Sequence, residues 1–263
     1  MTPEDGDCAE RLPRTRESQE PTLREHLERL RASTPARVFL GRSGPALPTR
    51  AVLDFQLDHA RARDAVTEAF APERIVEALG ARATRIVRSR AADLPTYLAR
   101  PDLGRRLDDD SAAALPHGDV DVVFVIADGL SARAVHRHAV PTLNATRTRL
   151  EGWRIAPIVI ACRARVALAD EVGERLGARL AVTLIGERPG LSSPDSLGVY
   201  LTWDPRVGRL DSERNCISNI RPPTGLSYEQ AAERLGNLMS AARRARHTGI
   251  GLEDEAGGGR LRG

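Results

Sequence analysis

The sequence predicts an α/β protein built around a doubly wound, mostly parallel sheet. Three short runs rich in Val, Ile and Leu lack polar alternation, as expected for parallel strands covered on both faces: Val120–Ala127, Ile155–Ala161 and Leu180–Ile185. Two segments with helical periodicity separate these runs. Strand, helix, strand, helix, strand is the order of a doubly wound unit, so we predict a Rossmann-like sheet domain over residues 119–250.

The two helices between these strands carry their own start and stop signals. Ser131 follows an Asp-Gly turn and is placed to cap the first helix. The second helix is expected to stop at Gly177, because glycine adopts the left-handed conformation of a helix end without strain. Its inward face repeats at Leu168, Val172 and Leu176.

The N-terminal part of the chain is predicted to be a disordered tail over residues 1–21, followed by a mainly helical region over residues 22–118. Polar and charged residues with several prolines dominate the tail. Thr22 and Glu25 form a capping box for a short helix that ends near Ser33. We place the boundary with the sheet domain near Pro116–Gly118, where turn residues cluster.

Within the helical region, Arg37–Leu40 is predicted to be a short strand and is followed by a Gly- and Pro-rich turn. That turn lacks the spacing of a phosphate-binding loop, so we interpret it as a plain connection. Thr49 then caps a long helix over Arg50–Phe70. Its buried side is predicted to consist of Val52, Leu53, Leu57, Ala60 and Val66.

The region continues with a helix over Pro72–Leu79, a strand over Thr84–Ser89 and a short helix capped by Asp93. The charged run Pro101–Ala114 is predicted to be exposed.

Beyond the doubly wound unit, two further strands are predicted over Val199–Trp203 and Arg214–Ile220. Ser227 and Gln230 cap the last helix. The inward face of that helix is expected to hold Ala231, Leu235, Leu238, Met239 and Ala242. The Gly-rich segment 251–263 is predicted to be a flexible tail.

Composition excludes several classes of function. Basic residues exceed acidic ones by only three, 39 against 36, and the two signs are interspersed, which argues against a nucleic-acid-binding surface. No apolar run approaches the roughly 20 residues that span a bilayer, so no membrane association is expected. Three widely spaced cysteines do not form a disulfide framework and indicate a cytoplasmic protein.

Candidate chemistry is sparse. No Cys-x-x-Cys or His-Glu-x-x-His pattern is present, so no metal site is predicted. Arg214 lies near Cys216 and could lower the pKa of its thiol, but no positioned base accompanies it. We therefore predict no catalytic residue and interpret Cys216 as a packed strand-end thiol.

Polar side chains do follow the strands of the doubly wound unit, namely Asp128, Arg165, Glu187 and Arg188. Parallel sheets bind ligands beyond the carboxyl ends of their strands, so these groups are candidate ligand contacts. Glu187 and Arg188 could instead only close the loop ahead of Pro189. The residues alone leave open a free-standing nucleotide- or phosphate-binding enzyme and a non-catalytic regulatory binding subunit.

Four blocks in order resemble the small (light) subunit of ethanolamine ammonia-lyase over Arg37–Gly251: GRSGPALPTRAVLDFQLDHARARDAV, VIADGLSARAVHRHAVP, LIGERPGLSSPDSLGVYLT and RNCISNIRPPTGLSYEQAA. The resemblance implies a carbon-nitrogen lyase that depends on adenosylcobalamin and converts ethanolamine to acetaldehyde and ammonia. It also implies a hetero-oligomer in which the large subunit binds ethanolamine and holds the catalytic centre, and region 22–118 is assigned contacts with that partner.

The resemblance further implies that the small subunit closes over cobalamin held between the two subunits, and that Val166, Glu187 and Cys216 contact this cofactor. For Cys216 this differs from the packed position inferred from the residues alone. A thiol that lines the cofactor pocket would satisfy both. The implied location is the cytoplasm, free or inside a bacterial microcompartment.

Overall fold

The computed structural model describes residues 22–34 and 36–252. The contacts within the chain divide it into two compact units, Met1–Val52 and Leu53–Gly263. The tails expected at 1–21 and 251–263 lie outside the described residues, except for Gly251 and Leu252. The first unit contains helix α1 and a tight turn in which Ser43 and Ala46 exchange two backbone hydrogen bonds, as expected of a plain connection.

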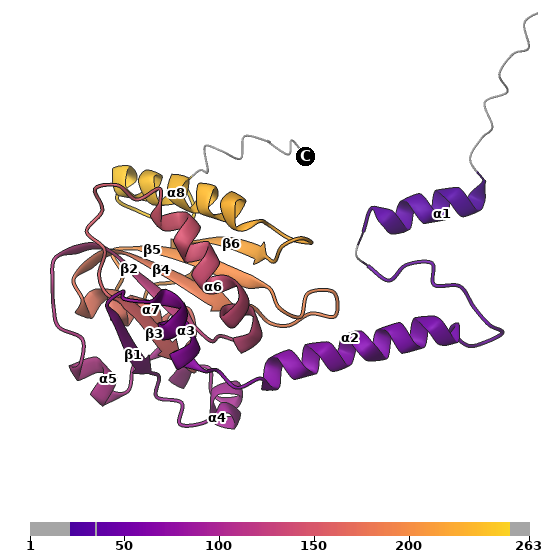
Figure 1. Cartoon of the computed structure of the whole chain (residues 1–263), viewed down its shortest axis with the longest axis horizontal. Coiled ribbons are helices and arrows are strands. Elements are labelled where there is room, and N and C mark those ends of the chain that lie inside the picture. The colour runs from indigo at the N-terminus through magenta and orange to yellow at the C-terminus, as the bar shows by residue number, and fades with distance from the viewer. Residues whose placement is uncertain (1–21, 35, 253–263) are drawn as a thin grey trace, which may run out of the picture. The chain divides into compact units, whose positions relative to one another are not determined.

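A six-stranded sheet with the order β1-β3-β2-β4-β5-β6 forms the centre of the second unit (Figure 1). The strands are β1 (Thr84–Arg88), β2 (Val120–Ala127), β3 (Ile158–Cys162), β4 (Ala178–Gly186), β5 (Leu197–Trp203) and β6 (Arg214–Ile220). The first four strands in this order pair in parallel, and β5 and β6 add antiparallel pairings. The protein is therefore α/β with a mixed sheet.

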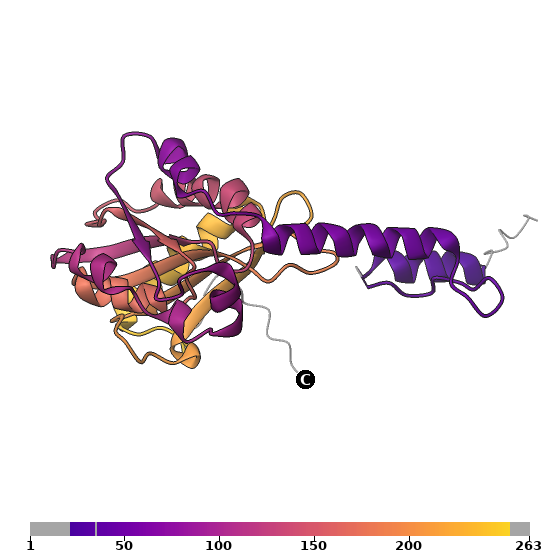
Figure 2. The same cartoon turned by 90° about the horizontal axis from the view of Figure 1, so that it is seen from below.

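Helices cover both faces of this sheet (Figures 1 and 2). Residues of α3, α6 and α8 pack on one face, and residues of α5 and α7 pack on the other. The helices are α1 (Leu23–Ala32), α2 (Thr49–Thr67), α3 (Pro72–Leu79), α4 (Leu94–Ala99), α5 (Asp109–Ala113), α6 (Ala132–Arg147), α7 (Leu168–Arg175) and α8 (Tyr228–Ala245), with 3-10 turns η1 (Leu103–Arg105) and η2 (Asp211–Glu213).

The unbroken apolar runs are strands because their side chains serve two cores. Phe124 and Val125 are neighbours on β2, pack into opposite cores and are both fully buried. The predicted limits of β2 and β6 are confirmed. Strand β3 begins three residues after the predicted Ile155, which contributes only an isolated bridge to Val122.

The predicted helix ends are confirmed where a side chain binds the backbone. Ser131 accepts a hydrogen bond from the Ala134 amide, and Asp93 accepts one from the Thr96 amide. Thr22 and Ser227 form capping boxes. Gly177 has φ +61° after α7, as its role at a helix end requires. The predicted inward face of α8 is buried throughout.

Two predictions for the N-terminal region are wrong. Residues Arg37–Leu40 form no strand, because no strand within residues 22–34 and 36–252 pairs with them. Helix α2 does not bury the predicted apolar side: Ala65 is its only buried residue, and Leu53 and Leu57 are 58% and 51% exposed. Helical periodicity shows which side chains share a face but does not show what covers that face.

The charged run Pro101–Ala114 is only partly exposed, in contrast to the prediction. It contains η1 and α5, and Leu107 within it is fully buried. The reason lies in α7, where the Glu171 carboxylate accepts hydrogen bonds from Arg106 Nε at 2.9 Å and from the Leu107 amide at 3.0 Å. Strand β1 precedes this run and pairs with β3, so the sheet draws one strand from region 22–118.

Candidate functional site

The loops after β2, β3 and β4 meet at one rim of the sheet. From β2 the chain passes through α6 to β3 on one side, and from β3 through α7 to β4 on the other side of β2. The connections of β2 and β4 therefore diverge, and a crevice opens between two adjacent parallel strands. Such a crevice is where open α/β sheets bind ligands.

Two glycines let the loops after β2 and β4 approach each other. Gly129 has φ +58°, and a Cβ atom there would overlap the Gly186 carbonyl oxygen. A Cβ atom on Gly186 would in turn overlap the Ser131 carbonyl oxygen. The floor of the crevice is therefore bare backbone, and any side chain at either position would force the loops apart.

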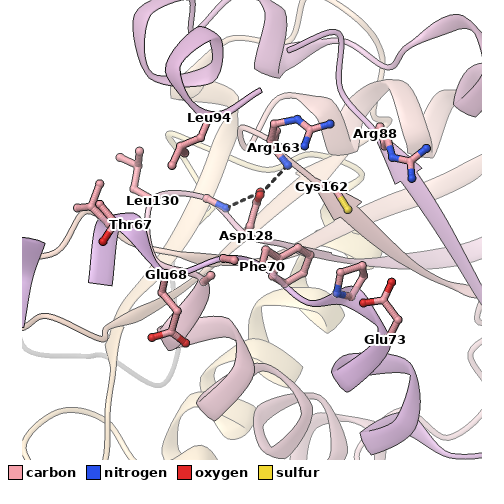
Figure 3. A pocket seen from close by; sticks show the side chains of 15 residues that line it. Thr67, Glu68, Phe70, Glu73, Arg88, Leu94, Asp128, Leu130, Cys162 and Arg163 are labelled. Atoms are coloured by element: carbon pink, nitrogen blue, oxygen red, sulfur yellow. Dashed lines mark hydrogen bonds between the residues drawn. The ribbon is translucent and has the colours of Figure 1, made fainter. Parts of the chain in front are cut away.

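Asp128 fastens the loop after β2 to the loop after β3. Its carboxylate accepts hydrogen bonds from the amides of Gly129 at 2.9 Å, Arg163 at 2.6 Å and Ala164 at 2.9 Å. Figure 3 shows this carboxylate directed at the Arg163 backbone, while Glu68 and Glu73 point away from it. Although Asp128 lies at a strand end, its carboxylate binds backbone amides of the protein itself and stabilises the two loops.

Burial raises the pKa of Asp128 to about 6, although the three amide donors favour the charged form. The folded state therefore binds more protons than the unfolded chain, whose Asp pKa is about 3.9. Stability is highest below the unfolded pKa and falls as pH rises through the folded pKa. We expect the free energy of unfolding to fall between pH 4 and pH 7 by about 2 kcal/mol more in the native chain than in Asp128→Asn.

Denaturant unfolding at the two pH values measures this difference. Asp128→Asn is expected to be less stable at both, because its amide nitrogen faces the Arg163 donor. The comparison therefore uses the change in the free energy of unfolding between the two pH values. The other carboxylates contribute equally to this change in the two proteins, so their contributions cancel. An identical change in both proteins would contradict the raised pKa.

A cavity of about 430 Å³ occupies the crevice, and we call it the switch-point pocket. The loops after β2, β3 and β4 supply most of its walls, and Tyr97 and Tyr200 complete it. Two of the three predicted cofactor contacts, Val166 and Glu187, line it. Val166 is half-buried in the turn before α7, which begins at Leu168.

Hydrogen bonds from the residue before β5 and from two residues of β6 hold the Glu187 side chain in place. Its two carboxylate oxygens accept hydrogen bonds from Ser196 Oγ and Ser218 Oγ, each at 2.5 Å. The Asn219 amide donates to the same carboxylate at 3.4 Å. Gly198 leaves the space beneath, since a Cβ atom there would lie 2.9 Å from Glu187 Oε1. The carboxylate is thus oriented by the protein and keeps acceptor capacity on its remaining lone pairs.

Cys216, the third predicted contact, lies on β6 and is not among the residues that line the switch-point pocket. It pairs across the sheet with Tyr200, which does line the pocket. Its interpretation as a packed thiol is wrong, because β6 is an edge strand and Cys216 is exposed.

The lowering of the Cys216 thiol pKa that Arg214 could have caused is not found. Partial loss of water around the sulfur and the nearby Glu187 carboxylate raise the pKa of its thiol, although a hydrogen bond with Tyr200 opposes the shift. Arg214 does not lower this pKa, because its guanidinium is directed to Asp170.

In the structure the Arg165 guanidinium lies over the Tyr97 ring, a pairing that no sequence motif indicates. The Arg165 guanidinium lies 4.3 Å from the centre of the Tyr97 ring and donates to the Tyr97 carbonyl at 3.2 Å. Gly104 packs against both, because a Cβ atom there would lie 2.9 Å from the ring. Within the described part of the chain, Arg165 Nε is buried without an acceptor and no carboxylate lies within 4 Å of the guanidinium.

A second cavity, of about 460 Å³, lies on the other side of the loop after β2 and shares Gly129 and Leu130 with the first (Figure 3). Phe70 forms part of its wall and stacks on His136 with ring centres 5.4 Å apart. His136 Nε2 accepts from the Ala71 amide at 3.1 Å, which fixes the chain between α2 and α3. Leu130 therefore stands between two openings on the same rim.

Among residues 22–34 and 36–252, no group of three or more His, Cys, Asp or Glu side chains is arranged to hold a metal ion. Over the same residues, no helix has the length and apolar character needed to cross a bilayer.

Comparisons with known proteins give one consistent result. The family model described as ethanolamine ammonia-lyase light chain matches residues 24–253. The chain is similar to an ethanolamine ammonia-lyase small subunit from Pseudomonas fluorescens, with 52% identity over 86% of this chain and 85% of the relative. A small subunit from Azotobacter vinelandii is 53% identical over 92% of this chain and 93% of the relative.

Proposed function

The chain belongs to the ethanolamine ammonia-lyase light chain family, and we propose that it forms one half of a cobalamin site that the large subunit completes. The chain is accordingly a subunit of an ammonia-lyase, the enzyme that takes ethanolamine to acetaldehyde and ammonia. The observation that carries the cofactor proposal is the convergence of Val166, Glu187 and Arg165 on one pocket at the rim of the sheet. We describe this sheet as doubly wound and Rossmann-like on the basis of its β2–β3–β4 crossovers.

The donors and acceptors of the pocket suit a corrinoid. A corrin ring carries amide side chains and a phosphodiester-linked nucleotide, so it offers both carbonyl or phosphate acceptors and N–H donors. Within the described residues the buried Arg165 Nε lacks an acceptor, and the oriented Glu187 carboxylate retains lone pairs. Val166 adds apolar contact in the turn before α7.

When bound, adenosylcobalamin supplies the radical chemistry of the reaction. In this proposal the residues of the chain position and shield the cofactor, and none has a catalytic role. Glu187 accepts hydrogen bonds from cofactor amides or a ribose hydroxyl, while the Tyr97 ring keeps Arg165 pointed at its acceptor. Cys216 extends the contact surface along β6. The closed rim keeps water from the partner's active centre, where ethanolamine binds.

The function is tested by co-expression with the large subunit. Acetaldehyde formation from ethanolamine with added adenosylcobalamin is expected only when both chains are present. A large subunit that turns over equally well alone would contradict the proposal. Tight binding of adenine nucleotides by the isolated chain would instead favour a free-standing nucleotide-binding enzyme, and a complex without acetaldehyde formation would favour a regulatory subunit.

Helix α2 is proposed to contact the large subunit. Apolar side chains along one stretch of this helix are exposed, with Leu53 at 58%, Phe55 at 45% and Leu57 at 51%. Such a concentration of exposed apolar groups is typical of an interaction surface. It also falls in region 22–118, to which the resemblance assigns partner contacts.

Replacing both leucines, Leu53→Ser with Leu57→Ser, is expected to weaken the complex with the large subunit at least about tenfold, since each loses buried apolar area. Co-purification from cells and titration of the purified chains measure the affinity. Gln56→Ser with Arg63→Ser, on the same helix, is the control that should bind like the parent. Equal affinity of both variants would place the interface elsewhere.

We also propose a cytoplasmic location for the assembled enzyme, free or enclosed in a microcompartment. The arrangement of cysteines supports a reducing environment. Fractionation of cells that express both subunits checks this location.

A further inference from the structure

A third cavity, separate from the switch-point pocket, is lined by arginine side chains. It has a volume of about 380 Å³ and lies between α2, α6, the loop from β4 to β5 and the end of β6. None of its lining residues belongs to the switch-point pocket. We call it the arginine pocket, and its charged side chains are Asp58, Arg61, Arg133, Arg137, Asp195 and Arg221.

Three of the four guanidinium groups have a carboxylate partner. Arg61 pairs with Asp58 at 3.5 Å, and Arg137 pairs with Asp195 at 2.7 Å. Arg133 pairs at 2.7 Å with Glu68, which lies outside the lining. Four guanidinium groups thus face three carboxylates, which leaves one positive charge.

That remaining charge is Arg221. Its Nη2 donates to Ser193 Oγ at 3.1 Å, and its Nε is buried without a hydrogen-bond partner. Within residues 22–34 and 36–252, no carboxylate lies within 4 Å of this guanidinium. A half-buried guanidinium with an unused donor is costly, because that donor has lost its hydrogen bond to water without gaining another.

Within the described residues, a second buried nitrogen next to this pocket also lacks a hydrogen-bond partner. His138 is 1% exposed, its Nδ1 lies 2.9 Å from the Tyr228 hydroxyl, and its Nε2 has no partner. The Asp195 carboxylate is 3.9 Å from this Nε2, which is too far for a hydrogen bond. Burial lowers the pKa of His138, and the neighbouring Arg137 and Arg221 lower it further, although the Asp195 carboxylate opposes the shift.

We propose that the arginine pocket binds an oxyanion of the phosphate class, with Arg221 as its principal ligand and Arg133 and Arg137 at its edge. A guanidinium fork matches phosphate oxygens in two parallel hydrogen bonds. One phosphate group offers enough acceptors to use Arg221 Nε and to bridge to the neighbouring guanidinium groups. A single carboxylate offers only two oxygens for the same set of donors.

Two ligands could supply the phosphate group, a free phosphate ion and the phosphodiester of cobalamin. Only binding of the cobalamin phosphodiester rests on the proposed function. Cobinamide distinguishes the two, because it retains the corrin ring but lacks the phosphodiester and nucleotide. The site itself is defined by binding of inorganic phosphate, which requires neither the cofactor nor the partner.

The test is equilibrium dialysis of radiolabelled inorganic phosphate against the full chain and against its complex with the large subunit. One phosphate per chain is expected, and Arg221→Gln is expected to weaken binding at least tenfold. Arg221→Lys, which keeps the charge but not the fork, should lie between the two. Arg234→Gln, an exposed arginine on α8 outside the pocket, is the matched control and should bind like the parent.

Cofactor competition then identifies the source. Displacement of phosphate by cobalamin but not by cobinamide would place the phosphodiester in the pocket, and retention of phosphate beside bound cobalamin would establish a separate phosphate site. Absence of phosphate binding, or equal binding by Arg221→Gln with native melting temperature, would overturn the proposal. The proposal would also be overturned if the parent bound no phosphate and Arg221→Gln no longer bound the large subunit. That result would assign the pocket to an acidic group of the partner.

Discussion

Combining Val166→Trp with Glu187→Lys is expected to raise the dissociation constant of the assembled complex for cobalamin at least about 100-fold, or about 2.7 kcal/mol. Tryptophan at 166 fills part of a cavity of about 430 Å³. Lysine at 187 removes the acceptor held by Ser196 and Ser218 and adds a positive charge to a pocket that already holds Arg165 and Arg188. Both changes act on the same rim of the sheet.

Equilibrium dialysis with cyanocobalamin, which needs no turnover, measures this affinity. The control is Val207→Trp with Glu233→Lys, which makes the same two changes at exposed positions outside the pocket. Single Glu187→Gln, which keeps one oxygen acceptor, should lose less affinity than Glu187→Lys. If the double variant keeps native affinity while co-purifying with the large subunit, the cofactor does not lie in the switch-point pocket.

The largest loss of stability is expected for Arg214→Met. Arg214 and Asp170 form an ion pair at 2.7 Å with only 2% of each side chain exposed. Arg214 also donates to Thr202 Oγ1 at 2.8 Å and to the Arg209 carbonyl at 3.0 Å. Its removal leaves a buried carboxylate without its counter-charge, which costs roughly 3–5 kcal/mol.

Urea unfolding measures this loss, and the double variant Arg214→Met with Asp170→Leu is the critical comparison. Replacing both charges by apolar side chains removes the uncompensated carboxylate, so most of the stability should return. In the single variant, stability should also rise on acidification, because burial already raises the pKa of Asp170 and Arg214 no longer opposes this. A double variant as unstable as the single one would show that packing, and not charge compensation, sets the loss.

Local signals determined most of what could be predicted about the fold. The run Val120–Ala127 is apolar at every position but Asp121, so its limits as β2 are confirmed residue by residue. The capping side chains Thr22, Asp93, Ser131 and Ser227 act on amides three residues away, and all four helix starts are confirmed. In these cases the partner lies within the segment, or the composition of the segment shows that both of its faces are covered.

Features that depend on distant partners were mispredicted or missed. Among the described residues, the strand expected at Arg37–Leu40 lacks a neighbour, and much of the predicted apolar side of α2 is exposed. Cys216 was placed in the core because its position at a sheet edge cannot be inferred from β6 alone. Arg165 depends on Tyr97, 68 residues earlier, and no spacing rule connects the two.

The pairing of β1 has a consequence for synthesis of the chain on the ribosome. In the described part of the chain this strand pairs with β3, and the register joins Thr84 to Ile158, 74 residues later. At roughly 5–20 residues per second, β1 leaves the ribosome roughly 4–15 seconds before its partner is made. During that interval the strand lacks its ladder of hydrogen bonds to β3, so nascent chains stalled between these two segments are expected to recruit chaperones more strongly than chains extended past Cys162.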